Sequence, residues 1–302
     1  MARPSMLLLF ASLLLGEAGG ELLRRRHAEP AQIPTREVAP GVQMPEVMCG
    51  MGGALMMSAV LSESGRERAR QLADTWLGLG GRGLDTAQVY NTEAAAGAAW
   101  QASGVPREEV FLLTKLDPST AMTFQAGAVK RSVAESLRKL GASALDLLLL
   151  HFPGPRAEQA WREMEELHAE GKVRALGVSN FEVDQLQRLM ATAKVPVAVN
   201  QRKMNIHTQD TAALDFCLRH NVTYQAYRPL DEGSGSLLRD PAVLAVAARA
   251  NRTAAQVALK WVLQRGAALT VQSEKEEHQR QDMDLFSWSL APEDVAALDA
   301  AR

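Results

Sequence analysis

Eight short apolar runs that alternate with longer amphipathic stretches constrain the fold of this 302-residue chain most strongly. A run such as Leu145–His151 is apolar almost throughout, which indicates a strand covered on both faces, as in a parallel sheet. Strict alternation of strand and helix predicts an α/β protein with one parallel sheet closed on itself, a (β/α)8 TIM barrel. The predicted strands are Val47–Gly52, Gly83–Thr86, Val110–Lys115, Leu145–His151, Ala175–Asn180, Val197–Gln201, Thr223–Tyr227 and Ala268–Ser273.

The stretches between these runs have apolar residues three and four positions apart, the spacing of one face of an α-helix. They predict helices over Arg66–Leu79, Ala126–Leu140, Ala157–Glu170, Val183–Ala193, Thr208–His220 and Thr253–Gln264.

The N-terminus predicts a separate segment. Residues 1–20 have the pattern of a secretory signal peptide, with a basic start, an apolar run from Met6 to Leu15 and small residues at the end. This run is shorter than the roughly twenty residues that span a membrane, so we expect no stable membrane anchor. Residues 21–38 predict a flexible extension, and residues 39–302 the barrel. We therefore expect the protein in the lumen of the secretory pathway or secreted. Two alternatives are a plastid, reached by a two-step address, and the cytoplasm, if the segment is not a functional signal.

Composition excludes several classes of function. A formal net charge of -2 gives no basic field, so we expect no nucleic-acid partner. The two cysteines, Cys49 and Cys217, are too few for a disulfide framework and lack the spacing of a zinc site. We expect both to be packing residues.

A glycine-rich segment over residues 78–83 matches the G-x-G-x-x-G fingerprint of dinucleotide-binding folds. That fingerprint requires a strand before it and a helix after it. Here a predicted helix precedes the glycines and a predicted strand follows. We therefore interpret them as the end of the helix and a turn.

Polar residues end most of the apolar runs. In a (β/α)8 barrel the carboxyl ends of the strands meet at one rim, where the active site lies. We therefore expect one polar site built from the residues at these ends, with Tyr90 five positions after the first of them. The residues at the strand ends are Asp85, Lys115, His151, Ser179, Asn180, Gln201 and Tyr227.

Several motifs resemble those of the aldo-keto reductase family, in the family's order, over nearly all of the chain from residue 41. The resemblance implies a reductase of a small-molecule carbonyl substrate, a nicotinamide cofactor (NADP, with NAD possible) and a monomer. It also implies a catalytic quartet of Asp85, Tyr90, Lys115 and His151. The matching stretches include Gly83–Tyr90, Leu113–Leu116, Leu149–Pro153, Gly171–Phe181, Val199–Gln201, Ala226–Leu230 and Ala255–Trp261.

The chemistry of such a quartet follows from the reaction. Hydride delivered to a carbonyl carbon leaves negative charge on the oxygen, and a positioned acid must supply a proton. A tyrosine hydroxyl has an ordinary pKa of about 10, which a neighbouring ammonium lowers. Lys115 would supply that charge to Tyr90, Asp85 would hold Lys115, and His151 would orient the substrate oxygen.

For the cofactor, the resemblance implies that Tyr227 stacks on the nicotinamide while Ser179, Asn180 and Gln201 bind its carboxamide. Ser273 matches the last residue of the Ile-Pro-Lys-Ser with which many members end their last strand, and is expected at the cofactor too. The family's lysine and a later arginine are replaced by Gln272 and His278. Loss of two cations weakens the expected preference for NADPH over NADH.

Other departures concern the substrate and the activity. Phe152 stands where many members have tryptophan, Arg228 where serine is usual, and Gly53-Ala54 where Thr-Trp is frequent. Smaller residues on one wall and a cation at the rim would admit a bulkier or anionic substrate. One alternative is a catalytically weak or inactive nucleotide-binding barrel with a regulatory role. Another is a glycoside hydrolase, which requires two carboxylates where only Asp85 qualifies. The complete quartet favours the reductase.

Overall fold

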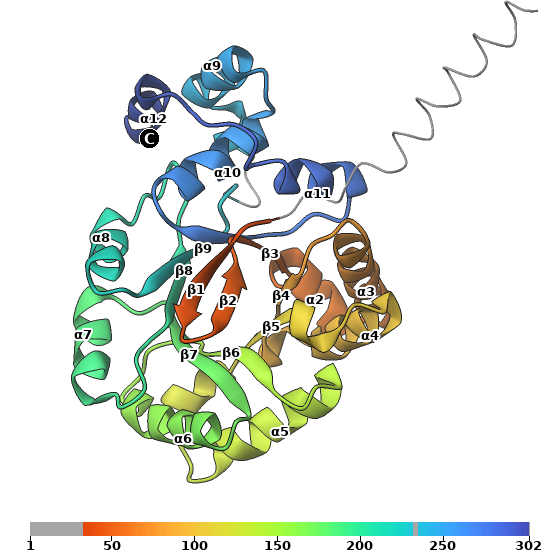
Figure 1. Cartoon of the computed structure of the whole chain (residues 1–302), viewed down its shortest axis with the longest axis vertical. Coiled ribbons are helices and arrows are strands. Elements are labelled where there is room, and N and C mark those ends of the chain that lie inside the picture. Colours follow the sequence, from red (N-terminus) through yellow and green to blue (C-terminus); the bar gives the residue numbers. More distant parts are fainter. Residues whose placement is uncertain (1–32, 232–234, 302) are drawn as a thin grey trace, which may run out of the picture. The chain divides into compact units, whose positions relative to one another are not determined.

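The computed structural model describes residues 33–231 and 235–301. Eight parallel strands close into a barrel, and helices surround it (Figure 1). This confirms the predicted (β/α)8 barrel, and each predicted run contains or overlaps one strand. In barrel order the strands are β3 (Val47–Gly50), β4 (Gly83–Asp85), β5 (Phe111–Lys115), β6 (Leu145–Leu150), β7 (Val173–Ser179), β8 (Val199–Lys203), β9 (Thr223–Tyr227) and β10 (Ala268–Val271), and β10 pairs with β3.

The six predicted helices are present, and the described residues contain further helices that the sequence pattern did not reveal. The predicted ones are α3 (Glu63–Gly78), α5 (Ala128–Leu140), α6 (Ala157–Ala169), α7 (Val183–Thr192), α8 (Thr211–Arg219) and α10 (Ala254–Gln264). The additional ones are α2 (Gly53–Leu61), α4 (Glu93–Ser103), α9 (Pro241–Ala250), α11 (Glu276–Met283) and α12 (Pro292–Asp299).

The glycine-rich segment over residues 78–83 ends a helix, as expected. Helix α3 finishes at Gly78 and β4 begins at Gly83. The N–H of Gly81 donates to the carbonyl of Trp76 at 2.9 Å, so this carbonyl in the last turn of the helix has a hydrogen-bond partner. A Cβ at Gly81 would lie 2.2 Å from Nε1 of Trp76, so only glycine fits this close turn.

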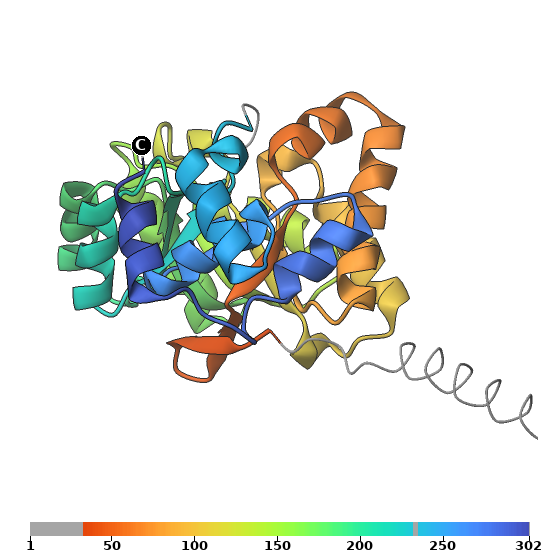
Figure 2. The same ribbon diagram turned by 90° about the horizontal axis from the view of Figure 1, so that it is seen from above.

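A β-hairpin closes the end of the barrel at which the strands begin. Its strands, β1 (Thr35–Ala39) and β2 (Val42–Pro45), are antiparallel, and Figure 2 shows them on the side of the barrel opposite α2. The flexible extension predicted over residues 21–38 was therefore wrong at its end, since residues 35–38 belong to β1. Strands of four or five residues with exposed polar positions give too weak an alternation to detect.

The predicted signal peptide and residues 21–32 of that extension lie outside the described residues, whereas residues 33 and 34 precede β1 without regular secondary structure. The predicted cellular address, which depends on them, stays a prediction. Within the part of the chain that the structure describes, no helix is both long and apolar enough to span a membrane.

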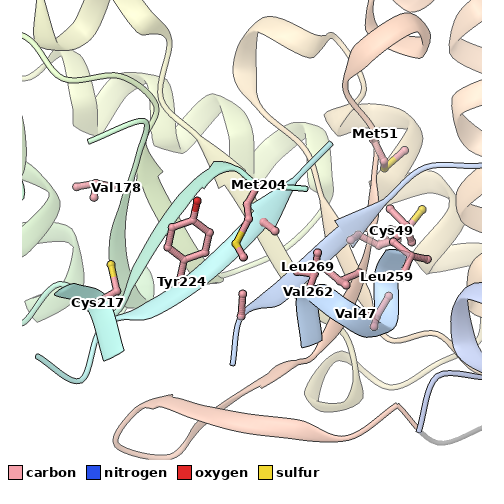
Figure 3. Close-up of a cluster of buried hydrophobic side chains, with 14 of the residues drawn as sticks. Val47, Cys49, Met51, Val178, Met204, Cys217, Tyr224, Leu259, Val262 and Leu269 are labelled. Atoms are coloured by element: carbon pink, nitrogen blue, oxygen red, sulfur yellow. The ribbon is translucent and has the colours of Figure 1, made fainter. Parts of the chain in front are cut away.

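The core has two layers, because each strand is buried on both faces. Leu147 and Leu149 of β6 point into the barrel, where Met44 of the hairpin covers the interior cluster from below. Leu148 and Leu150 point outward and pack under the helices. Figure 3 shows part of this outer layer, with β3 and β10 side chains beside residues of α10. Both cysteines are buried free thiols, as expected: Cys49 and Cys217.

Candidate active site

Strand alternation places the polar residues at the carboxyl end of the barrel interior. Side chains two positions apart on a strand share a face. Lys115 therefore follows Leu113 on the inward face of β5, and His151 follows the inward Leu149 of β6. The same interior that is apolar at its lower end thus becomes polar at its upper end.

A cavity of about 680 Å³ opens at this end of the barrel. The structure brings eight of the nine predicted site residues to its wall. The ninth, Ser273, lies on the loop before α11 and does not line the cavity. Its hydroxyl lies 3.3 Å from Nδ1 of His278, a residue of α11. The eight lining residues are Asp85, Tyr90, Lys115, His151, Ser179, Asn180, Gln201 and Tyr227.

A buried ion pair lies at the floor of the cavity. The ammonium of Lys115 donates to the carboxylate of Asp85 and, at 3.0 Å, to the carbonyl of Thr86. Lys115 is 1% exposed and Asp85 is 2% exposed. Gln201 Nε2 donates to the second carboxylate oxygen at 2.8 Å. Burial lowers the pKa of Lys115, but the carboxylate of Asp85 and the phenol of Tyr90 raise it more, so the pKa is raised overall. Lys115 is therefore an ammonium at neutral pH.

Tyr90 stands above this ion pair, at the end of the 3-10 helix η1 (Gln88–Tyr90). Its ring centroid is 4.9 Å from Nζ of Lys115. A Cβ at Gly52 would lie 2.9 Å from Cε2 of Tyr90, so the ring packs directly against a glycine of the β3–α2 turn. The next residue, Asn91, adopts a left-handed conformation with φ 55° and donates to the carbonyl of Ala59 in α2 at 3.1 Å. These contacts fix the direction of the phenol.

His151 is the second group at the phenol. Its Nε2 lies 3.5 Å from the Tyr90 hydroxyl, and its ring stacks on Phe152 with centroids 4.9 Å apart. Burial, and secondly the charge of Lys115, lower the pKa of His151 to about 3. The imidazole is therefore neutral at physiological pH and offers one N–H as a donor.

The opposite wall presents an aromatic ring and three amide or hydroxyl side chains. The Tyr227 hydroxyl donates to Asn180 Oδ1 at 2.8 Å, and Asn180 Nδ2 donates to the Ser179 hydroxyl at 3.1 Å. The side-chain oxygen of Gln201 makes no hydrogen bond to any described residue, although Gln201 is only 2% exposed. An amide-bearing aromatic ring fits this wall, because it offers both an N–H donor and a flat face.

Other residues at the site went unrecognised in the sequence. Gln225 accepts from Gln201 at 2.7 Å, and its place two positions before Tyr227 on β9 was the signal that could have revealed it. Gln272, which the resemblance matches to the family's lysine, was recognised by position but not by its contact: it donates to the carbonyl of Gly52 at 3.0 Å and so supports the surface behind Tyr90. Met56 and Met57 line the cavity from α2, a helix that was not predicted.

A buried ammonium under a phenol, a neutral imidazole beside it and an aromatic, amide-lined wall define a class: an oxidoreductase acting on carbonyl groups. A sequence model of the aldo/keto reductase family matches residues 50–302. An aldo-keto reductase of Mycobacterium avium (strain 104) is 35% identical over 276 residues, which cover 90% of this chain and 91% of that protein. The glyoxal reductase of Bacillus subtilis (strain 168) is 34% identical over 225 residues, or 73% of this chain and 79% of that protein.

Solved structures agree with the sequence relatives. An aldo/keto reductase from Brucella melitensis has a TM-score of 0.80 at 28% identity, covering 89% of this chain and 99% of that chain. A putative 2,5-diketo-D-gluconic acid reductase B has a TM-score of 0.79 at 29% identity, covering 89% and 92%. The chain belongs to the aldo/keto reductase family, whose members are carbonyl reductases that use NAD(P)H.

Proposed function

We propose that this chain reduces an aldehyde or ketone to an alcohol with NAD(P)H as hydride donor and Tyr90 as proton donor. One observation carries the proposal: the buried ammonium of Lys115 lies 4.9 Å from the Tyr90 ring, and the neutral His151 lies 3.5 Å from its hydroxyl. A tyrosine between a cation and a neutral donor is suited to release a proton toward an oxygen that becomes negative.

When bound, the reduced nicotinamide supplies hydride to the carbonyl carbon. The residues of this chain handle the oxygen. His151, with its proton on Nε2, donates a hydrogen bond that orients the carbonyl oxygen, and Tyr90 transfers its hydroxyl proton as charge develops there. The ammonium of Lys115 stabilises the phenolate that remains. Asp85 and the carbonyl of Thr86 hold that ammonium in place.

Tyr227, Ser179, Asn180 and Gln201 would hold the nicotinamide, by stacking and by hydrogen bonds to its carboxamide. NADPH is the expected form, with NADH also accepted. The segment on which the resemblance places the 2′-phosphate carries Glu274, Glu276 and Glu277 together with Lys275. Glu274 is bound to Arg68 at 2.6 Å. Arg280, a cation of α11, is bound to Glu276 at 2.6 Å. This charge balance supports a weak preference between the two cofactors. The monomeric state stays a prediction.

The test replaces Tyr90 by phenylalanine in the full chain, with Tyr224→Phe as the matched control. Tyr224 is buried on the same barrel, but its hydroxyl donates to Asp210 outside the cavity at 2.7 Å. We expect Tyr90→Phe to lower kcat by about a hundredfold to ten-thousandfold, the effect of a lost general acid. Cofactor binding, followed by quenching of tryptophan fluorescence, is expected to be unchanged.

Tyr224→Phe is expected to keep near-normal turnover. Carbonyl reduction that survives in Tyr90→Phe would refute the role of Tyr90. Failure of the unaltered chain to oxidise either reduced cofactor with any aldehyde would favour the regulatory barrel instead.

A further inference from the structure

Two buried glutamine side chains lie next to each other in the barrel interior. Gln201 of β8 and Gln225 of β9 are direct register partners on neighbouring parallel strands. Gln201 lines the cavity, whereas Gln225 does not. Gln225 precedes Tyr227 by two positions and so shares its face of β9. It therefore lies in the layer directly beneath the cavity wall, where the polar site meets the apolar interior cluster.

The stability of the fold gives no reason for an amide at this position. Gln225 is completely buried, and its Nε2 has only the sulfur of Met48, a member of the interior cluster, as a partner among the described residues, at 3.3 Å. Sulfur is a weak acceptor, and a buried amide with poor partners is unfavourable. An apolar side chain at this position would bury no polar atom. The contribution of Gln225 is the acceptor that it presents to Gln201.

Asp85 determines how the two amides are oriented. A carboxylate can only accept hydrogen bonds, so the atom of Gln201 that meets Asp85 Oδ2 at 2.8 Å is the nitrogen. The same nitrogen donates at 2.7 Å to the oxygen of Gln225. Both hydrogens of this NH2 group are therefore in use, one on the catalytic ion pair and one on Gln225.

These two hydrogen bonds fix the plane of the Gln201 amide. One bond alone would leave the amide free to rotate about it, whereas two bonds from one NH2 group hold it at two points. The oxygen of Gln201 is directed away from both partners and makes no hydrogen bond to any described residue. Since Gln201 lines the cavity, this oxygen is an acceptor with a fixed direction for a bound ligand. A group held in its binding orientation beforehand loses less entropy on binding.

We propose that Gln225 is a positioning residue, which holds the oxygen of Gln201 in the direction that accepts a hydrogen bond from the NH2 group of the nicotinamide carboxamide. The inference rests on the proposed function and adds to it the residue that sets this contact. Gln225 does not line the cavity, so it acts through Gln201 alone. Its loss should affect NADH and NADPH equally, because both carry the carboxamide.

The test replaces Gln225 in the full chain by methionine, an unbranched side chain of similar length without an amide. Kd is measured by quenching of tryptophan fluorescence for NADH, NADPH and two comparison ligands. ADP-ribose lacks the nicotinamide, and the reduced 3-acetylpyridine analogue of NADH has a methyl group in place of the carboxamide NH2. We expect Gln225→Met to raise Kd for NADH and NADPH by about twofold to tenfold, the effect of one hydrogen bond. Kd for both comparison ligands should stay unchanged.

Gln209→Met is the matched control. Gln209 donates from its amide to the carbonyls of Ile206 and Asp299, at 3.2 Å and 2.8 Å, but it does not line the cavity. We expect this variant to leave all four Kd values unchanged. A double variant adds a second measurement. Gln225→Met should raise Kd for NADH no further when Gln201→Met is already present, because the effect passes through Gln201.

Equal weakening of all four ligands by Gln225→Met, unchanged binding of NADH and NADPH, or an additive effect in the double variant would overturn the role of Gln225 and leave the reductase intact. Failure of the unaltered protein to bind either NADH or NADPH would overturn both proposals. Urea unfolding of each variant shows whether the fold is retained. Gln225→Leu takes the place of Gln225→Met in the same assay if the methionine variant does not fold.

Discussion

Asp282 is a buried carboxyl group without a hydrogen-bond or ion-pair partner among the described residues, and its replacement by asparagine is expected to stabilise the protein at neutral and alkaline pH. The side chain, on α11, is 5% exposed. None of the hydrogen bonds among the described residues involves its carboxyl group. Burial alone raises the pKa of Asp282 from 3.8 to about 7. Its ionised form is therefore disfavoured in the folded state.

The sign and size of the effect follow from the two pKa values. Between pH 3.8 and about 7 the unfolded chain has lost the Asp282 proton while the folded chain still holds it. The stability of the unaltered protein therefore falls as pH rises through this interval, and the loss is complete above it. Each pKa unit corresponds to about 1.4 kcal/mol, so the full interval corresponds to about 4 kcal/mol. Asparagine has nearly the same shape as the protonated acid, so at pH 4 the two proteins should be almost equally stable.

The assay is urea unfolding at pH 4.5 and pH 8, followed by tryptophan fluorescence and circular dichroism. Asp284→Asn is the control, because Asp284 is 44% exposed and pairs with Arg252 at 2.9 Å. Loss of this surface ion pair is expected to destabilise by about 0–1 kcal/mol at both pH values. The reasoning is refuted if the difference between Asp282→Asn and the unaltered protein is the same at both pH values, or if the variant is the less stable one at pH 8.

Three further predictions follow from the interior of the barrel. Lys115→Met leaves the Asp85 carboxylate buried without its partner and is expected to lower the free energy of unfolding by about 3–5 kcal/mol at pH 7; adding Asp85→Asn should recover part of the loss, and additive effects would contradict the coupling. Because the pKa of His151 is lowered from 6.5 to about 3, the unaltered protein loses stability as pH falls through that interval. His151→Gln should lose less stability between pH 6.5 and 4.5, measured by urea unfolding. Parallel pH profiles of the two proteins would argue against a neutral imidazole. Met44→Ala removes a side chain of the hairpin that is 0% exposed, and is expected to lower the free energy of unfolding by about 2–5 kcal/mol, measured by thermal unfolding. KM should be unchanged because the cavity lies at the other end of the barrel, and a raised KM would contradict this separation.

The barrel was predictable because strands buried on both faces leave an unmistakable pattern in the sequence. Leu145–Leu150 is the clearest instance, with alternate leucines in the inner and outer core layers. Helices with a polar outer face, such as α5 and α7, were equally clear. Each contrast arises from burial, so the sequence carries it directly.

The elements that escaped prediction lack such a contrast. Helix α4 consists largely of alanine and small residues, so its two faces look alike in sequence. Helix α2 begins after Gly52, which gives no side-chain cap, and its exposed positions hold the apolar residues Met57, Val60 and Leu61 in place of a polar face. The hairpin β1–β2 depends on the barrel that it covers, and this tertiary contact is not encoded in either short strand alone.

Most of the site was predictable in residue type and place, because the ends of parallel strands converge on one rim. The sequence did not show in which direction each of these side chains points. Ser273 follows β10 like the other candidates follow their strands, yet its hydroxyl bonds with His278 and lies off the cavity wall. Gln272, one residue earlier, faces the cavity and bonds with Gly52. Such a choice between neighbouring residues is made by loop geometry and packing.

The hairpin and the active site are linked through the barrel interior. Val42 and Met44 belong to the apolar cluster that fills the barrel interior below the polar site. Exclusion of water strengthens the attraction between Lys115 and Asp85 and lowers the pKa of His151. The residues from Thr35 onward belong to the same compact unit as the barrel, although none of the hairpin residues lines the cavity.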